Sequence, residues 1–253
     1  MLSVARPLSK LRFVVGPDFQ GESQLTRVRK AVSRSKAGVQ GKVADVATGK
    51  SLHAESLNEL AAFRIILACA RVDLCQEQPC VLEFHYAGQR HRYTPDVLLA
   101  WGTYRELVEI KDDADAELPE NQERFVAVKE ALAGHGYEFR VWRKSEILAE
   151  PRISNSVLVL RYRAVCPSTL ERERIRRTLA EHQKLTISAL ARISGASIQS
   201  TLRLVLDGTL HINWWEQLTR TSQISSFPIG QQTWPCPPSL LSRALGMSHE
   251  AVF

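Results

Sequence analysis

The stretch RYTPDVLLAWGTYRELVEIKDD, from Arg92 to Asp113, decides the fold because it predicts a tight hairpin. Gly102-Thr103 lies between two apolar runs, and a two-residue loop that begins with Gly is typical of a hairpin turn. Counting outward from the turn, the predicted pairs are Trp101 with Tyr104, Leu99 with Glu106, Leu98 with Leu107, Val97 with Val108, and Asp96 with Glu109.

This register places two carboxylates, those of Asp96 and Glu109, on neighbouring strands. Directly opposed residues have Cβ atoms roughly 4.5 to 5.5 Å apart, and two like charges there destabilise the pair. Lys111 lies two residues beyond Glu109 and therefore points to the same face. The apolar pairs Leu98–Leu107 and Val97–Val108 occupy opposite faces, so we expect an inner strand pair.

The predicted carboxylate pair has two explanations. A divalent cation such as Mg²⁺ binds one or two carboxylates and completes its shell with water and phosphate oxygens. Alternatively, the pair is a partly solvated strand end at which Lys111 neutralises Glu109. The register and the preceding Tyr-Thr-Pro favour the metal site.

Length and composition indicate a globular protein. The chain has 253 residues, and 44% of them are hydrophobic, which is enough for a sizeable core. We find neither a membrane-spanning run nor a signal peptide, so we expect a cytoplasmic protein. The five cysteines are odd in number and contain no C-x-x-C; we expect reduced thiols, with no disulfide framework and no zinc site. His85 and His91 have no third ligand in the pattern and are read as ordinary histidines.

Charge is divided along the chain. Residues 1–50 carry ten Lys or Arg against three Asp or Glu, residues 51–160 carry twelve against eighteen, and residues 161–203 carry nine against three. Basic flanks attract nucleic acid through its phosphates, whereas an acidic middle repels it unless metal ions are bound there. The pattern therefore favours a DNA-binding protein that also binds metal.

The elements predict a mixed α/β core. We expect a helix over residues 51–72, capped by Ser51, on which Glu55 and Glu59 share one face. A strand at Cys80–Tyr86, the hairpin, a helix from about Pro119 to Ala133 and a strand at 137–142 follow. The helix makes the strand of Glu109 and the strand at 137–142 parallel neighbours, so we expect a mixed sheet flanked by helices.

The C-terminal part predicts a second, smaller domain. Residues 166–220 have the order helix, helix, Gly-containing turn, helix and strand-like wing that is typical of a winged helix-turn-helix. Residues 221–253 are Pro-rich and read as an extended docking tail. We therefore divide the chain into a basic, partly structured arm (1–50), an α/β domain (51–165), a winged-helix-like domain (166–220) and the tail.

These motifs resemble a known family. Glu55-Ser56 and Glu59 on a helix, then Gln78-Pro79, then Tyr93-Thr94-Pro95-Asp96, then Glu109-Ile110-Lys111 are similar to the TnsA family of transposon end-cleaving endonucleases, over residues 52–142. The resemblance implies a restriction-endonuclease-like fold of the PD-(D/E)xK superfamily and a helical, winged-helix-like C-terminal domain.

The resemblance also implies roles for individual residues. Asp96 and Glu109 would bind Mg²⁺ or Mn²⁺, with two ions in the site, and Glu59 would complete the site from its helix, with Glu55 as the rival for that role. Lys111 would orient the attacking water or steady the phosphate. Gln78 matches a family position whose role, structural or DNA-facing, stays open.

The resemblance implies partners as well. Family members cut the 5′ side of each transposon end, while a separate integrase-type transposase cuts the 3′ side under the control of an AAA+ ATPase. Double-stranded DNA is then the substrate, and the protein would be nucleoid-associated when bound to it in a bacterial cytoplasm. Candidate DNA contacts are Arg29, Lys30, Arg34 and Lys36 of the arm and Arg203 of the second helix-turn-helix helix.

Two alternative functions and one open role of a helix remain from the sequence. The protein could be a restriction or repair nuclease of the same fold, or a DNA-binding adaptor that has lost catalysis. The joint presence of Asp96, Glu109 and Lys111 argues against the adaptor. The helix that contains Arg203 offers few base-reading groups, so it could dock protein instead of DNA.

Overall fold

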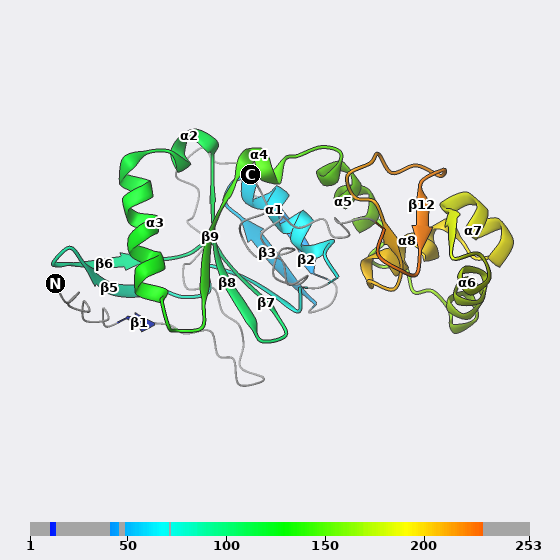
Figure 1. Ribbon diagram of the computed structural model, residues 1–253, viewed down its shortest axis with the longest axis horizontal. Coiled ribbons are helices and arrows are strands. Elements are labelled where there is room, and N and C mark those ends of the chain that lie inside the picture. The colour runs from blue at the N-terminus through cyan, green and yellow to red at the C-terminus, as the bar shows by residue number, and fades with distance from the viewer. Residues whose placement is uncertain (1–10, 14–40, 46–48, 71, 230–253) are drawn as a thin grey trace, which may run out of the picture. The chain divides into compact units, whose positions relative to one another are not determined.

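The computed structural model describes residues 11–13, 41–45, 49–70 and 72–229, which form a mixed α/β chain (Figure 1). The chain divides into two compact units. The first contains β1 (Arg12–Phe13) and residues Asp73–Lys144, and the second contains Gln40–Val72 and Ser145 onward. The predicted arm and tail lie mostly outside the described residues, and the four predicted domain boundaries stay predictions.

A four-stranded sheet forms the centre of the first unit. Its order is β4-β7-β8-β9, in which β7 and β8 are antiparallel and β8 and β9 are parallel. The sheet is therefore mixed, as predicted, with the hairpin strands inside it. Its strands are β4 (Leu74–Glu77), β7 (Val97–Trp101), β8 (Tyr104–Lys111) and β9 (Glu138–Arg143).

The hairpin has the predicted register. Trp101 pairs with Tyr104, Leu98 with Leu107 and Val97 with Val108. Gly102 has a φ of 51°, in the left-handed region that favours glycine. The ladder ends at Val97–Val108, one pair before the two carboxylates.

A helix covers one face of this sheet. α3 (Pro119–Leu132) follows the short α2 (Asp113–Ala116) and has Pro119 in its first turn, where a missing N–H costs nothing. Its residues Phe125 and Val128 are buried in one cluster with sheet residues that include Leu98 and Phe139. The crossover makes β8 and β9 parallel neighbours, which confirms that prediction.

A second hairpin extends the first unit. β5 (Leu82–Tyr86) pairs with β6 (Gln89–Tyr93), and β1 adds to the outer side of β5. The predicted strand is β5, although it begins at Leu82 and not at Cys80. β6, with the sequence QRHRY, was not predicted because its polar residues give no hydrophobic alternation; pairing with β5 makes it a strand.

The first helix begins later than the sequence predicts. Residues from Lys50 to Ala54 form β3, which pairs with β2 (Gly41–Asp45), and α1 runs over Leu57–Leu67 with Ser56 as its N-cap. The prediction that Ser51 caps the helix is therefore wrong, because these residues pair with a strand from the expected arm. Glu55 precedes the helix, so it does not share a helical face with Glu59.

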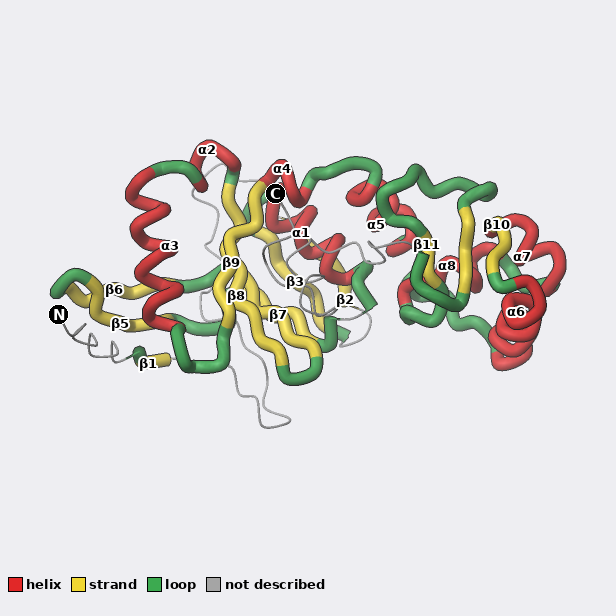
Figure 2. The backbone as a smooth tube through the Cα atoms, in the orientation of Figure 1, coloured by secondary structure: helices red, strands yellow, loops and turns green. Residues whose placement is uncertain are grey.

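The second unit contains a helical group and a small sheet. α6 (Thr169–His182), α7 (Ile187–Ser194) and α8 (Ile198–Leu206) follow in the predicted order, and Gly195 between α7 and α8 is left-handed. α4 (Lys144–Ile147) and α5 (Arg152–Leu160) were not predicted. Three short strands form a sheet of order β10-β12-β11, namely β10 (Lys184–Thr186), β11 (His211–Ile212) and β12 (Gln223–Ser225) (Figure 2). The winged-helix assignment itself stays a prediction.

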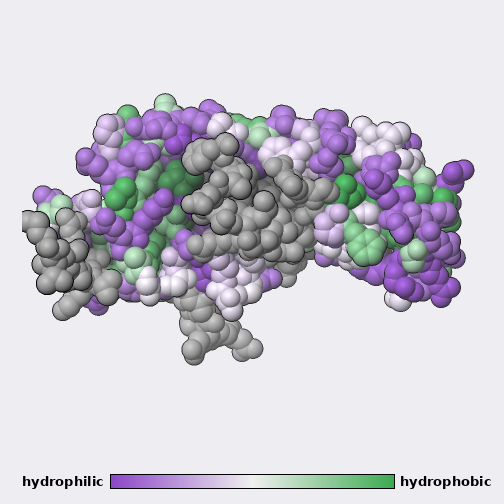
Figure 3. All heavy atoms as spheres, in the orientation of Figure 1, coloured by the Kyte–Doolittle hydropathy of each residue, from purple (hydrophilic) through white to green (hydrophobic). Residues whose placement is uncertain are grey.

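The second unit has its own core and a charged surface. Buried residues such as Trp214, Leu190, Leu204 and Ile224 form one apolar cluster. The visible face over α6 and α7 is mostly hydrophilic (Figure 3), and the exposed arginines of α6 are Arg172, Arg174, Arg176 and Arg177. Across the described residues, no helix combines the length and the apolar character that crossing a membrane requires.

Candidate active site

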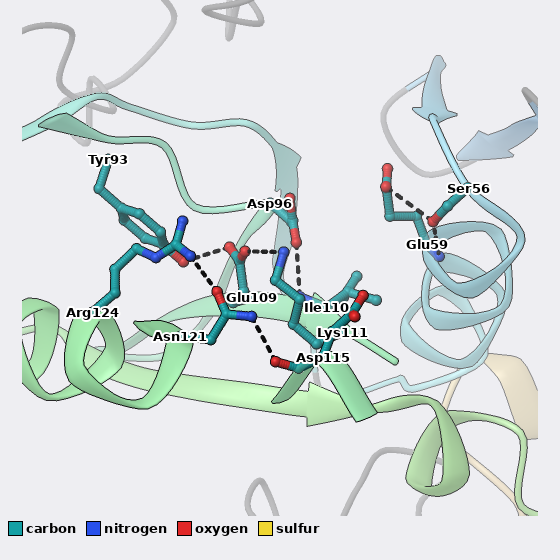
Figure 4. A network of polar contacts seen from close by, with 10 residues as sticks. All are labelled: Ser56, Glu59, Tyr93, Asp96, Glu109, Ile110, Lys111, Asp115, Asn121 and Arg124. Carbon is teal, nitrogen blue, oxygen red and sulfur yellow. Dashed lines mark hydrogen bonds and ion pairs between the residues drawn. The ribbon is translucent and has the colours of Figure 1, made fainter. Parts of the chain in front are cut away.

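Asp96 is held from two sides at the start of β7. Its backbone carbonyl accepts a hydrogen bond from the Gln78 amide at 2.7 Å, and its Oδ2 accepts one from the Ile110 amide at 2.7 Å (Figure 4). The bond from Gln78 extends the pairing of β4 with β7 by one residue. The bond from Ile110 extends the contact of β7 with β8, and its acceptor is the Asp96 carboxylate and not a backbone carbonyl. Asp96 therefore has a fixed position beside β8.

Glu109 lies almost buried on β8, with a relative exposure of 6%. Its Oε2 accepts a hydrogen bond from the hydroxyl of Tyr93, and its Oε1 lies 2.7 Å from Nζ of Lys111. Figure 4 shows the Glu109 carboxylate between these two groups. The structure thus brings Asp96, Glu109 and Lys111 together, and it contains the Lys111–Glu109 ion pair that the sequence offered as the alternative to a metal site.

Burial and charge change the pKa of both neighbours of Glu109. Burial raises the pKa of Tyr93 well above its usual value, and the charge and hydrogen bond of Glu109 raise it further. Burial alone would lower the pKa of Lys111, but Glu109 and Asp96 outweigh that effect and raise it. Tyr93 therefore stays a neutral donor and Lys111 stays a cation at neutral pH.

Gln78 directly follows the last residue of β4 and lies beside Asp96, to which its backbone amide is hydrogen-bonded. β4 pairs with β7 up to Glu77–Val97, so the bond between the Gln78 amide and Asp96 continues this ladder. Gln78 is buried and has a φ of 42°, a strained conformation for a residue with a side chain. The family position identified from the sequence is thus part of the bracket that holds Asp96.

Sequence reasoning missed a polar group on α3. Asn121 is buried, its Nδ2 donates to the backbone carbonyl of Asp115 at 2.6 Å, and its Oδ1 accepts from the guanidinium of Arg124. Arg124 is exposed, and Figure 4 shows its guanidinium beside the hydroxyl of Tyr93. The only sequence signal for the contact between Asn121 and Arg124 is that the two residues are three positions apart on a predicted helix. Tyr93, in contrast, stands within the Tyr-Thr-Pro-Asp motif.

Glu59 belongs to the second unit, on α1. Its backbone amide donates to Oγ of Ser56 at 3.1 Å, and its carboxylate accepts from the same Oγ at 3.0 Å and from the Glu55 amide at 2.9 Å. This arrangement is a helix cap of the Ser-x-x-Glu type. Its predicted catalytic role stays a prediction, as does the rival role of Glu55.

The predicted DNA contacts have two different outcomes. Arg29, Lys30, Arg34 and Lys36 lie outside the described residues. Arg203 on α8 forms an ion pair with Asp207, whose other oxygen lies 3.2 Å from Arg172. Arg203 is therefore already neutralised in the second unit, and its DNA contact stays a prediction.

The candidate metal ligands of this site are carboxylate oxygens, which hard divalent cations prefer. Asp96 and Glu109 supply two carboxylates from neighbouring strands, and we find no group of three His, Cys, Asp or Glu residues placed to hold a metal ion in the described part of the chain. Mg²⁺ suits such a pair, because it keeps several waters and commonly uses one or two carboxylates together with substrate phosphates. A closed site made of protein ligands alone is not indicated by these residues.

Comparison with known families gives a match that includes most of the residues of this site. Residues 69–143 match the model of the TnsA-like endonuclease N-terminal domain, which confirms the resemblance. The matched residues include Gln78, Tyr93, Asp96, Glu109 and Lys111, whereas Glu59 precedes them. No curated protein matches the chain.

Proposed function

Because residues 69–143 carry a TnsA-like endonuclease N-terminal domain, we propose that this protein is a metal-dependent DNA endonuclease that cleaves the 5′ side of transposon ends in cut-and-paste transposition. One observation supports it most strongly: Asp96 and Glu109 lie on neighbouring strands with Lys111 paired to Glu109 at 2.7 Å. A transposon-associated nuclease in general follows from the family match, while the metal, the cleaved strand and the partners belong to the proposal.

Asp96 and Glu109 would hold Mg²⁺ or Mn²⁺, with two ions in the site and Glu59 as a further ligand. Bound metal would supply neutralisation of the charge that develops on the attacking and leaving oxygens of a phosphodiester. Hydrogen bonds orient both carboxylates before substrate binds: the Ile110 amide donates to Asp96, and the Tyr93 hydroxyl donates to Glu109. Such preorganisation avoids the cost of ordering these groups during the reaction.

Lys111 has two possible tasks that its chemistry permits. An ammonium donates hydrogen bonds and accepts none, so it can orient water through the water oxygen or neutralise a phosphate oxygen. It cannot take a proton from the attacking water while it is charged. We therefore assign Lys111 an orienting and charge-neutralising role, without a covalent nucleophile in the reaction.

The wider assignment follows the resemblance. Residues 51–165 would be the restriction-endonuclease-like domain, and residues 166–220 a winged-helix-like domain that docks DNA or protein. Because Arg203 is paired with Asp207, α8 offers little free charge for reading bases, which favours protein. The partners would be an integrase-type transposase and an AAA+ ATPase regulator.

A restriction or repair endonuclease with the same site is the second candidate. Its active site would be indistinguishable, so strand and sequence preference must separate the two functions. The non-catalytic adaptor is disfavoured because the two carboxylates, the hydrogen-bond donors that fix them and Lys111 are all present.

Transposon-end DNA labelled on each strand in turn tests the proposal. The protein is incubated with Mg²⁺, with and without the partner transposase, and a scrambled duplex of equal length serves as control. We expect a cut at the 5′ side of the end and none in the scrambled duplex. Equal cutting of both duplexes points to the restriction or repair alternative, and no cutting under any condition rejects the proposed activity.

A further inference from the structure

Arg124 has the properties of a group placed to meet a ligand. It lies in the N-terminal half of α3, is exposed, and donates a hydrogen bond to Oδ1 of Asn121. Among the described residues, no carboxylate forms an ion pair with Arg124. Most exposed arginines of α6, by contrast, pair with acidic neighbours such as Glu173 or Asp207.

Asn121 acts as a bracket for this guanidinium. The amide has a relative exposure of 7%, and its Nδ2 is anchored on the carbonyl of Asp115. Burying an amide costs free energy unless its donor and acceptor are both satisfied. Here the acceptor is satisfied by an exposed cation, so the same bonds that satisfy Asn121 also hold Arg124 in one orientation.

The bracket holds Arg124 beside the carboxylates. Figure 4 shows its guanidinium next to the hydroxyl of Tyr93, which donates to Oε2 of Glu109. Lys111 meets the other oxygen of the same carboxylate. Two cations from different elements, β8 and α3, thus lie on the two sides of Glu109.

We propose that Arg124 is a further catalytic residue that binds a non-bridging oxygen of the scissile phosphodiester, and that Asn121 is the residue that positions it. A guanidinium presents several N–H donors in a fixed fork that matches phosphate oxygens. Because Asn121 orients the guanidinium before the reaction, Arg124 can stabilise the negative charge that develops on the phosphate. This inference rests on the proposed nuclease function, and it assigns a substrate contact to a helix outside the Asp-Glu-Lys motif.

The test pairs two variants of α3 with two substrates. Arg124→Gln removes the proposed contact, while Lys129→Gln removes one positive charge from another exposed position of the same helix and is the control. The substrates are transposon-end duplexes with an ordinary or a methylphosphonate linkage at the cleavage position, the latter lacking one charged oxygen. Affinity is measured in EDTA, so the result does not depend on metal, and single-turnover cleavage of the ordinary duplex is measured with Mg²⁺.

We expect Arg124→Gln to weaken binding of the ordinary duplex about tenfold, the size of one charge-assisted hydrogen bond. The variant and the wild type should bind the methylphosphonate duplex with similar affinity, because neither protein can form the contact with the missing charged oxygen. Cleavage by Arg124→Gln should fall on the order of 100-fold. Asn121→Ala should lower cleavage less, and the double variant should be no worse than Arg124→Gln alone.

The inference is overturned if Arg124→Gln behaves like Lys129→Gln, or if its binding defect is the same with both duplexes. In either case Arg124 is only a solvated helix cation. A wild-type protein that neither binds nor cuts the end DNA overturns the proposed function and this inference together. Thermal melts complete the set, since the loss of one hydrogen bond to Asn121 should lower the melting temperature of Arg124→Gln by only a few degrees and leave the protein folded in these assays.

Discussion

The hydroxyl of Tyr93 donates a hydrogen bond to Oε2 of Glu109, and this bond joins the end of β6 to β8. Tyr93 belongs to the sheet β1-β5-β6, whereas Glu109 belongs to the sheet β4-β7-β8-β9. The ring of Tyr93 also packs edge-on against Phe139, at 5.9 Å between centroids. One side chain thus joins two sheets and fixes the central carboxylate of the candidate active site.

Tyr93→Phe should keep the ring packing and remove only the donor. We expect the free energy of unfolding to fall by about 1 to 2 kcal/mol, because Glu109 keeps Lys111 but loses one partner. Cleavage should fall about 10- to 100-fold, as is typical when a group that orients a metal-binding carboxylate is removed. Chemical denaturation and single-turnover cleavage measure the two effects.

Tyr86→Phe on β5 makes the same chemical change away from Glu109 and is the control for Tyr93→Phe. If both variants cleave at the wild-type rate, the Tyr93 hydroxyl does not fix the carboxylate.

Two substitutions of Asp96 separate charge from backbone support. Asp96→Asn retains an oxygen that can accept from the Ile110 amide, whereas Asp96→Ala leaves that amide without its partner. Both should abolish Mg²⁺-dependent cleavage. Only Asp96→Ala should lose stability, by about 1 to 2 kcal/mol, because its loss of a hydrogen bond outweighs any relief of carboxylate repulsion.

Denaturant unfolding without metal measures this difference between the Asp96 variants. If Asp96→Ala proves as stable as the wild type, relief of carboxylate repulsion fully offsets the loss of the 2.7 Å bond to Ile110, which contradicts this prediction.

Glu106, on the opposite face of β8, predicts a pH dependence of stability. It is fully buried, Nε of Arg140 lies 3.7 Å from its Oε1, and burial raises its pKa from 4.5 to about 7. A raised pKa means that the folded state disfavours the charged carboxylate, so stability falls as the pH rises from about 4.5 to about 7.

Glu106→Gln removes this effect. We expect the variant to gain stability relative to the wild type between pH 5 and pH 8, by up to about 3 kcal/mol. The exposed Glu123→Gln is the control and should show no such change. A constant difference between Glu106→Gln and the wild type across this range would mean that Glu106 stays charged throughout.

The sequence predicts this hairpin well because local rules determine it. The Gly102-Thr103 turn and the period-2 apolar pattern specify the register without any distant partner, and Asp96, Glu109 and Lys111 follow from that register. The crossover helix is equally local, since Pro119 marks its start.

Other elements depend on distant contacts. Residues 51–54 read as part of a helix because the strand that pairs with them lies in a segment rich in Arg, Lys, Ser and Gly. The Ser56-x-x-Glu59 cap was the local signal for the true start of α1. Asn121 and Arg124 carry no such signal, because their importance comes from tertiary contacts of α3 with Asp115 and with the region of Tyr93.

Asn155 ties α5 to the loop after β11 in the second unit. Its Nδ2 donates to the carbonyls of Trp214 and Glu216 at 3.0 and 2.8 Å, and its Oδ1 accepts from the Leu218 amide at 2.9 Å. Asn155→Ala should therefore destabilise the second unit by about 3 kcal/mol or more, since it leaves buried backbone groups without partners.

Hydrogen exchange of residues 210–225 and thermal melts measure the effect of Asn155→Ala. Gln217→Ala, on the same loop but exposed to solvent, is the control. Unchanged protection in Asn155→Ala would show that the loop is held by its apolar contacts alone.

Single-turnover cleavage by Glu109→Gln and Glu106→Gln tests the central claim most directly. Both variants change one carboxylate to an amide on the same strand, but Glu109 belongs to the candidate active site and Glu106 lies on the other face. With Mg²⁺ and end-labelled transposon DNA, we predict that Glu109→Gln reduces the rate on the order of 1,000-fold and that Glu106→Gln stays near the wild-type rate. Equal rates for the two variants, whether both high or both low, would contradict the account.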